Sequence, residues 1–310
     1  MIRKPKTPFE DPLRRRKKLP VPGIVLLVFA GLLILSTLLA AGNLCLTVSR
    51  YDIHSAKLPE SFDGMRIVQI SDLHDASFGS GNSRLLRRIS ALSPGAILIT
   101  GDLISSGDRN FEPVFSLVSG LVQLAPTYFS LGNHEQLHAL FRETTGPSFL
   151  EQLASSGVVI LDNQAAVLKH GPDEIKLYGY SCDIPFYAAQ DYLMAEGLSG
   201  SDPTPLLEKL GKSGDGFNLL MAHNPGFLDS YAAWGADLVL SGHLHGGVIR
   251  LPFVGGLLSP SREWFPKRDA GLYHSGSTDM VVNRGLGNSV IPVRIGNPPD
   301  ITLITLHSGK

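Results

Sequence analysis

The sequence contains very little cysteine. Cys45 and Cys182 are the only cysteines in 310 residues, and they lie far apart in the chain. A bridge between them is not expected, so the predicted fold does not depend on disulfides. Any metal site in this chain must use oxygen and nitrogen donors in place of clustered thiolates.

Positive charge is scarce after residue 20. The whole chain has a formal charge of −1, and the first twenty residues carry +6, which leaves −7 for the rest. An acidic domain argues against broad nucleic-acid binding, so no nucleic-acid partner is expected. No protein partner is inferred either. A phosphate substrate is still compatible, because bound divalent ions supply local positive charge.

Charge is absent altogether between residues 21 and 48. An uncharged apolar run of this length predicts a transmembrane helix, and the preceding basic cluster is expected to stay in the cytoplasm. The predicted organisation is therefore a basic cytoplasmic tail at 1–20, a single-pass membrane anchor at 21–48 and a large extracytoplasmic domain at 49–310. A cleaved signal peptide is the alternative, because Leu39-Ala40-Ala41 offers a small-residue cleavage site.

Short apolar runs alternate with helical patterns in the large domain. Strands are predicted at 66–70, 96–100, 127–131, 217–221 and 238–240, and helices at 83–92 and 112–124. Continuous apolar runs are typical of strands that are buried on both faces. The alternation predicts a layered α/β domain.

A polar motif follows each of these predicted strands. The motifs are Asp72-Leu-His74, Gly101-Asp102, Gly132-Asn133-His134-Glu135, His223 and Gly242-His243-Leu-His245-Gly246. In open α/β sheets, binding sites form beyond the carboxyl ends of the strands, so we expect these motifs to converge. Their imidazole, carboxylate and amide donors suit a pair of moderately hard divalent metals such as Mn, Fe or Zn.

The order of these motifs resembles that of the calcineurin-like metallophosphoesterases. The resemblance covers residues 50–306 and is strongest to the membrane-anchored bacterial branch described as phosphodiesterases. It implies a layered α-β-β-α sandwich and a site for two divalent metal ions. One metal would be held by Asp72, His74 and His245, the second by Asn133, His223 and His243, with Asp102 bridging the two.

The resemblance also implies a mechanism. A hydroxide that bridges the two metals would attack the phosphorus. His134 would stabilise the phosphoryl charge or protonate the leaving oxygen. Many relatives carry an acidic residue three positions after the GD motif, which orients this histidine, but Ser105 stands there in this chain. His134 is therefore expected to lack a carboxylate partner or to borrow Asp108 or another group.

The late loops offer candidate substrate contacts. Lys267 and Arg268 lie in a loop with Trp264, Phe265 and Tyr273, and Arg284 lies in an Arg-Gly-Leu-Gly segment. The alternative is that the loop is an ordinary exposed loop and that Arg284 is a structural arginine at a strand end.

Three functional hypotheses follow from these residues. The first is a membrane-anchored phosphoesterase acting on a phosphodiester or phosphomonoester of the envelope, including lipid-linked esters. The second is a pyrophosphatase that cleaves a nucleotide-diphosphate lipid of the UDP-diacylglucosamine type, against which an extracytoplasmic domain counts. The third is a scaffold that has lost catalysis, against which the seven intact ligand positions count.

Overall fold

The computed structural model describes residues 21–74, 76–141, 148–187, 207–260, 263–288 and 293–309. The chain divides into two compact units, Met1–Leu38 and Leu39–Lys310. The first contains most of helix α1, Val21–Leu44. No helix within the described residues combines the length and apolarity needed to cross a membrane. The anchor predicted at 21–48 stays a prediction, and the basic tail at 1–20 lies outside the described residues.

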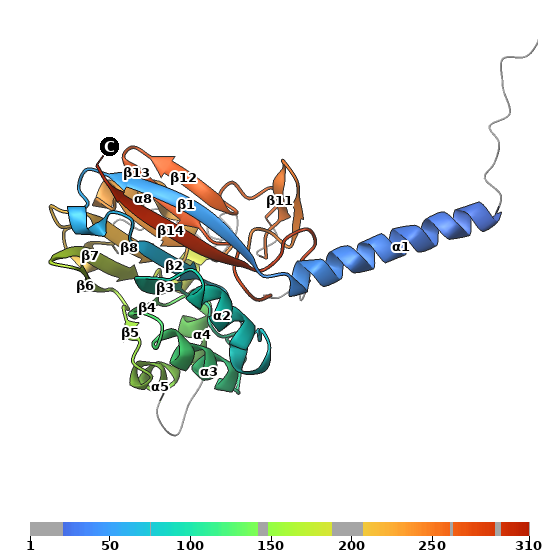
Figure 1. Ribbon diagram of the computed structural model, residues 1–310, viewed down its shortest axis with the longest axis horizontal. Helices are drawn as coiled ribbons and strands as arrows, with labels where there is room; N and C mark the ends of the chain where they lie inside the picture. Colours follow the sequence, from blue (N-terminus) through green and yellow to red (C-terminus); the bar gives the residue numbers. More distant parts are fainter. Residues whose placement is uncertain are drawn as a thin grey trace, which may run out of the picture. The chain divides into compact units, whose positions relative to one another are not determined.

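The second unit is built on two six-stranded sheets, shown in Figure 1. Sheet A has the order β1 (Thr47–Ser55), β14 (Asp300–Ser308), β2 (Arg66–Ile70), β3 (Ala96–Thr100), β4 (Thr127–Ser130), β5 (Val159–Ile160). Sheet B has the order β12 (Gly271–Ser275), β13 (Thr278–Val282), β9 (Leu238–Ser241), β8 (Asn218–Ala222), β7 (Asp173–Tyr180), β6 (Gln164–His170). Strands β2 to β5 run parallel in sheet A, as do β7, β8, β9 and β13 in sheet B.

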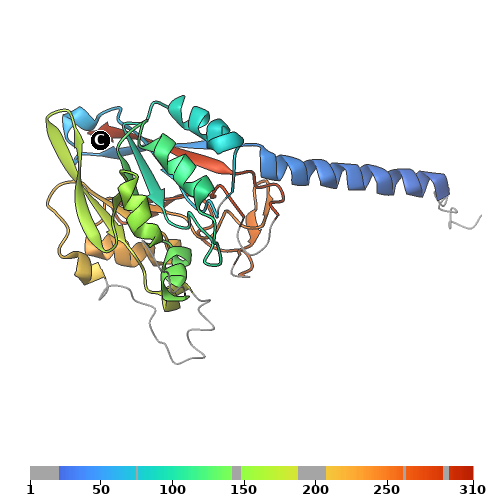
Figure 2. The same cartoon turned by 90° about the horizontal axis from the view of Figure 1, so that it is seen from below.

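Helices cover the outer faces of both sheets, as Figures 1 and 2 show. These helices are α2 (Ser83–Ser90), α3 (Glu112–Leu121), α4 (Asn133–Phe141), α5 (Phe149–Ser155) and α8 (Leu228–Trp234). The connections contain the 3₁₀ turns η1 (Glu60–Phe62), η2 (Ser80–Asn82), η3 (Ile184–Tyr187), η4 (Glu208–Leu210) and η5 (Pro225–Phe227). A separate two-stranded sheet pairs β10 (Ile249–Leu251) with β11 (Gly255–Leu258).

Three apolar clusters define the layers. One joins sheet A to α2, α3 and α5, with Ile97 and Leu117 among its buried members. A second lies between the sheets, where Leu98 of β3 and Leu219 of β8 share one cluster. The third packs α8 on the outer face of sheet B, through Tyr231. Strands buried on both faces explain the continuous apolar runs, and the predicted α/β fold is confirmed.

Candidate dimetal site

The seven predicted metal ligands lie immediately beyond the carboxyl ends of five parallel strands. In sheet A, Asp72 and His74 follow β2, Asp102 follows β3, and Asn133 follows β4 as the first residue of α4. In sheet B, His223 follows β8, and His243 and His245 follow β9. The side chains from the two sheets therefore converge at one end of the sandwich.

The backbone is strained at most of these positions. Asp72, His74, Asp102, His243 and His245 all hold positive φ angles, between 45° and 73°. A non-glycine residue in this region costs on the order of 1–3 kcal/mol, and such residues concentrate at functional sites. Five of the seven predicted ligands carry this cost, so the fold holds these side chains in place against their local preference.

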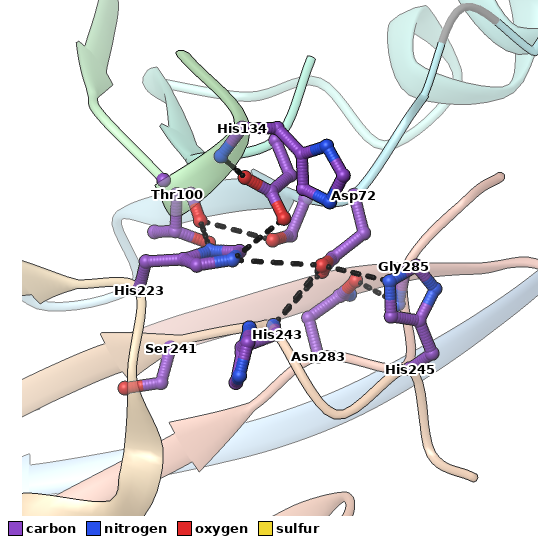
Figure 3. Close-up of polar contacts among 12 residues, drawn as sticks. Asp72, Thr100, His134, His223, Ser241, His243, His245, Asn283 and Gly285 are labelled. Atoms are coloured by element: carbon purple, nitrogen blue, oxygen red, sulfur yellow. Dashed lines mark hydrogen bonds and ion pairs between the residues drawn. The ribbon is translucent and has the colours of Figure 1, made fainter. Parts of the chain in front are cut away.

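In the first cluster two ring nitrogens lie close together, and one of them lies beside a carboxylate. Nε2 of His74 lies 3.1 Å from Nε2 of His245, which lies 3.2 Å from Oδ1 of Asp72. Donor atoms of these three residues lie close enough together to hold one metal ion. Figure 3 shows the Asp72 carboxylate among His223, His243 and His245.

Asp102, His223 and His243 form the second cluster. Nε2 of His223 lies 3.1 Å from Oδ2 of Asp102. The same oxygen lies 3.8 Å from Nε2 of His74, which belongs to the first cluster. Asp102 thus faces both clusters, and so does Asp72, whose Oδ1 lies 3.8 Å from Nε2 of His223. The family resemblance assigns the bridging role to Asp102.

A buried oxygen without a hydrogen-bond partner and an oriented histidine ring indicate that these residues fit metal ions. Oδ1 of Asn133 is buried and has no hydrogen-bond partner, which is costly unless a cation meets it. Nδ1 of His223 donates to the carbonyl of Thr100 at 2.6 Å, which directs Nε2 toward Asp102. Such a bond to the second ring nitrogen is how proteins orient metal-binding histidines. Oxygen and nitrogen donors of this kind suit divalent ions of the Mn, Fe and Zn group.

Three of the four predicted ligand rings are held in the neutral form that can bind a cation. Burial lowers the pKa of His74 to about 4, that of His243 to about 3 and that of His245 well below its usual value, so these rings are neutral near pH 7. Burial also lowers the pKa of His223, but the charges of Asp102 and Asp72 outweigh it and raise the value to about 10. The carboxylates therefore create a field that attracts positive charge to this ring.

The two carboxyl groups differ in their ionisation. Burial opposes ionisation of Asp102, but His223 and His74 hold its pKa well below the usual range. Burial raises the pKa of Asp72 to about 6. Asp102 is thus the more firmly ionised of the two carboxyl groups.

His134 receives its hydrogen bond from the main chain. The backbone N–H of Ser106 donates to Nδ1 of His134 at 3.0 Å, and the backbone N–H of His134 donates to Asp102 at 2.9 Å. Of the alternatives expected for His134, which were no carboxylate partner, Asp108 or another group, Asp108 is not used, because it accepts the N–H of Ser105 at 2.6 Å. The ring of His134 packs edge-on against His74, with centroids 4.7 Å apart.

Glu135 supports the site in a way that the sequence alone did not indicate. Its buried carboxylate accepts the backbone N–H groups of Asp102 at 2.9 Å, Leu103 at 2.7 Å and Gly132 at 2.8 Å. It therefore ties the turn after β3 to the turn after β4. The motif showed Glu135 beside His134, but the bonds to Asp102 and Leu103 join residues about thirty positions apart, so only the folded chain shows them.

Arg294 and Tyr187 are two further neighbours that the motifs did not include. The buried guanidinium of Arg294 donates to the carbonyls of Arg284 and Gly287 and lies 3.4 Å from Nδ1 of His245. The ring of Tyr187 stacks edge-on near His243, with centroids 4.9 Å apart. Neither residue follows a strand in a recognisable motif, so no sequence signal could have placed it here.

The candidate substrate residues lie outside these clusters. Arg284 pairs with Asp300 at 2.8 Å and donates to Thr47 at 3.1 Å, which is the geometry of the structural alternative. Arg268 donates to the carbonyl of Gly226 at 2.9 Å and lies 3.4 Å from Asp229. Lys267 is exposed. The structure does not bring these three side chains together with the predicted ligands.

Comparisons with known proteins agree with this geometry. The family model for calcineurin-like phosphoesterases matches residues 65–247. The chain is 31% identical to the uncharacterized metallophosphoesterase YkuE of Bacillus subtilis, over 84% of this chain and 85% of the relative. It is 29% identical to the phosphodiesterase YaeI of Escherichia coli, over 78% and 82%. It is also 31% identical to a Danio rerio protein named transmembrane protein with metallophosphoesterase domain, over 82% and 56%.

The family match covers every strand end that carries a predicted ligand. Metallophosphoesterases are metal-dependent hydrolases of phosphoric esters that use two divalent ions, and the His and Asp clusters here are able to hold them. The chain belongs to the calcineurin-like phosphoesterase family.

Proposed function

We propose that this protein is a membrane-tethered phosphodiesterase with two metal ions at the ends of β2, β3, β4, β8 and β9. The observation that carries the proposal is the convergence of seven oxygen and nitrogen donors, five of them on strained backbone, at one end of the sandwich. Strain of this kind persists only where the surrounding structure imposes it.

The ligand assignment follows the family resemblance, and the two clusters agree with it for six of the seven residues. Asp72, His74 and His245 would hold one ion, and Asn133, His223 and His243 the other, with Asp102 facing both. When bound, the ions supply Lewis acidity and an acidified water for attack on phosphorus. The other contributions come from side chains of this chain.

His134 is the proposed proton carrier. Because the N–H of Ser106 occupies Nδ1, the neutral ring holds its proton at Nε2. That N–H would donate to a phosphoryl or leaving-group oxygen. The backbone N–H of His134 also donates to Oδ1 of Asp102. The backbone of His134 thus orients this carboxylate, while its ring would donate a proton to the substrate.

A phosphodiester substrate is favoured by the relative that is named a phosphodiesterase. The alternative substrate, a nucleotide-diphosphate lipid, has no such support among the comparisons. Tethering rests on the uncharged run at 21–48 with its basic flank, and on relatives whose names include a transmembrane protein. An extracytoplasmic site follows from the same charge asymmetry.

Metal dependence tests the catalytic part of the proposal. Exhaustive chelation of the purified full chain should abolish hydrolysis of a chromogenic phosphodiester, and Mn should restore it. A screen with Mn should then compare phosphomonoesters, phosphodiesters and UDP-lipids at equal concentration. Activity that survives chelation would contradict the two-metal assignment, and a preference for UDP-lipids would replace the diester as substrate.

A further inference from the structure

Exposed apolar side chains gather at one small region of the catalytic unit. Among the described residues after α1, seven large hydrophobic side chains are exposed, and five of them lie between residues 251 and 265. They are Leu251 (43% exposed), Phe253 (108%), Val254 (58%), Trp264 (69%) and Phe265 (60%), and together they form the apolar hairpin patch. Single exposed hydrophobics are ordinary, but a cluster with three large aromatics marks an interaction surface.

The patch is displayed on a small sheet of its own. Strands β10 and β11 pair with each other, Trp264 forms a bridge with Leu258, and the N–H of Phe265 donates to the carbonyl of Leu257 at 2.9 Å. Figure 1 shows β11 apart from the two large sheets. Phe253 and Phe265 hold positive φ angles of 67° and 52°, which disfavour bulky residues. The aromatic rings are therefore presented at a conformational cost.

The root of the hairpin, at Val248, Arg250 and Leu258, is hydrogen-bonded to the metal-site loop, which carries His243 and His245. Arg250 pairs with Asp269 at 2.5 Å and donates to the carbonyl of Gly246 at 3.1 Å, beside His245. The N–H of Val248 donates to the carbonyl of Leu258 at 2.7 Å. A surface that binds the hairpin would therefore also position the loop that carries His243 and His245.

The hairpin root also lies near the point where the chain enters the domain. The N–H of Arg250 donates to the carbonyl of Ile295 at 2.9 Å, and the N–H of Thr47, which begins β1, donates to the carbonyl of Pro299 at 2.9 Å. Residues 295 and 299 are separated by at most about 14 Å of chain. Thr47, the first residue of β1, and the hairpin root therefore lie at the same end of the domain.

We propose that the apolar hairpin patch inserts into the surface of a phospholipid bilayer, and that the substrate is a phosphoester carried by a lipid in that surface. This inference rests on the proposed tether. Tryptophan and phenylalanine are the residues that enter the interface between water and acyl chains. The exposed Lys267 beside the patch suits anionic headgroups. Because the hairpin root carries the metal-site loop, insertion brings the site to the headgroup layer.

The two tryptophans of the chain provide the test and its control. Trp264 lies in the patch, whereas Trp234 lies on α8 and donates to the carbonyl of Gly211. The full chain is reconstituted in vesicles of phosphatidylcholine and phosphatidylglycerol, with ordinary or brominated acyl chains. In the Trp234→Phe variant, Trp264 emission should shift to the blue and be quenched by bromine. In the Trp264→Phe variant, Trp234 emission should be the same in both vesicles.

Activity gives a second measurement. Phe253→Ser should reduce hydrolysis of a phosphodiester embedded in the vesicle several-fold and leave hydrolysis of a soluble chromogenic diester unchanged. Leu140→Ser, at a 70% exposed position on α4, is the matched control and should change neither. A Phe253→Ser variant that loses both activities equally would contradict the inference.

The outcomes separate this inference from the proposed function. Loss of soluble diester hydrolysis by the unmodified, metal-loaded chain would defeat the proposed function itself. Failure of the chain to float with vesicles would defeat the tether, and the patch inference with it. A chain that floats and hydrolyses the soluble diester while Trp264 emission stays unquenched would overturn the patch inference alone. Blue-shifted but unquenched Trp264 emission would indicate that a second copy of the chain covers the patch. That result would also overturn the patch inference.

Discussion

At the scale of single residues, the orientation of His134 comes from a main-chain donor. The N–H of Ser106 points at Nδ1, where relatives with an acidic residue after the GD motif would supply a carboxylate. A carboxylate would stabilise a doubly protonated ring, whereas an N–H donor requires an unprotonated Nδ1. His134 is therefore suited to act as a neutral donor through Nε2, and Ser105 is free to face Nδ1 of His74 at 3.4 Å.

Substitution separates metal binding from turnover at this site. Asp102→Ala should lose metal, because its carboxylate faces both clusters. His134→Ala should keep its metal while turnover falls by about 10²–10⁴, the usual range for a general acid. Elemental analysis and initial rates of the two purified variants provide the measurement. Equal metal loss in both variants would make His134 a ligand and refute its role as proton donor.

Glu135 makes a second prediction at this scale. Its carboxylate accepts three backbone N–H groups at 2.7–2.9 Å inside the protein. In Glu135→Gln, an amide NH₂ replaces one of these acceptors and meets N–H donors. Leaving buried donors unsatisfied costs about 1–3 kcal/mol each. We expect the melting temperature to fall by about 5 °C or more, with reduced metal retention because the turn bearing Asp102 loosens.

The control for this substitution is Glu112→Gln. Glu112 is exposed in the first turn of α3. Surface substitutions of this kind usually change stability by less than about 0.5 kcal/mol. Thermal melts with and without added Mn compare the two variants. If both melt alike, the buried bonds of Glu135 do not stabilise the turns as inferred.

At the scale of elements, the five predicted strands were placed well because their signal is local, whereas the other strands of the two sheets were not predicted. The run at 66–70 is β2 and the run at 96–100 is β3, residue for residue. The runs at 127–131, 217–221 and 238–240 match β4, β8 and β9 within one residue at each end. Continuous apolar runs indicate strands that are buried on both faces. Because binding sites form beyond the carboxyl ends of such strands, the position of each strand also predicts the position of its ligand.

Contacts that depend on long-range pairing could not be predicted in this way. Gln69 of β2 donates to Thr100 of β3 and to the carbonyl of Ser241 in β9, each at 2.9 Å, and so ties sheet A to sheet B beneath the site. Nothing in the run Arg66–Ile70 distinguishes this glutamine from a solvent-facing one. The partners of Arg284 and Asp108 are equally invisible, because a charged residue pairs with whatever the fold brings near it.

The close approach of two strand-end turns gives a prediction for Gly132. A Cβ added there would overlap Oδ1 of Asp102 and lie 2.7 Å from its backbone nitrogen. Gly132→Ala should therefore displace the Asp102 carboxylate, and a displacement near 1 Å costs about 10² in rate. We expect lower metal content and at least that loss of diester hydrolysis.

Gly216→Ala is the matched control, because its added Cβ would meet nothing within 4 Å. Both substitutions reduce the flexibility of the unfolded chain equally, so the difference between the variants isolates the contact with Asp102. Metal content and rate should be unchanged in Gly216→Ala. A Gly132→Ala variant with full metal and full activity would show that the two turns can separate without harm.

At the scale of the whole molecule, charge is distributed unevenly along the chain. Eight basic residues precede Val21, and the remainder of the chain has a net charge of −7. Positive charge beside an apolar run is retained on the cytoplasmic side. An acidic domain has no electrostatic reason to stay there. The proposed topology, with the metal site outside the cytoplasm, rests on this asymmetry.

Reporter fusions test that topology. A reporter that works only outside the cytoplasm, fused after Lys310, should be active, and a cytoplasm-only reporter at the same place should be silent. The protein should remain in the membrane pellet after washing at high salt or alkaline pH, because an inserted helix is held far more firmly than a surface helix. In a matched fusion, neutralising the six basic residues between positions 6 and 18 should weaken the bias. The opposite reporter pattern would place the site in the cytoplasm, where nucleotide-diphosphate lipids are made, and would remove the main objection to a pyrophosphatase.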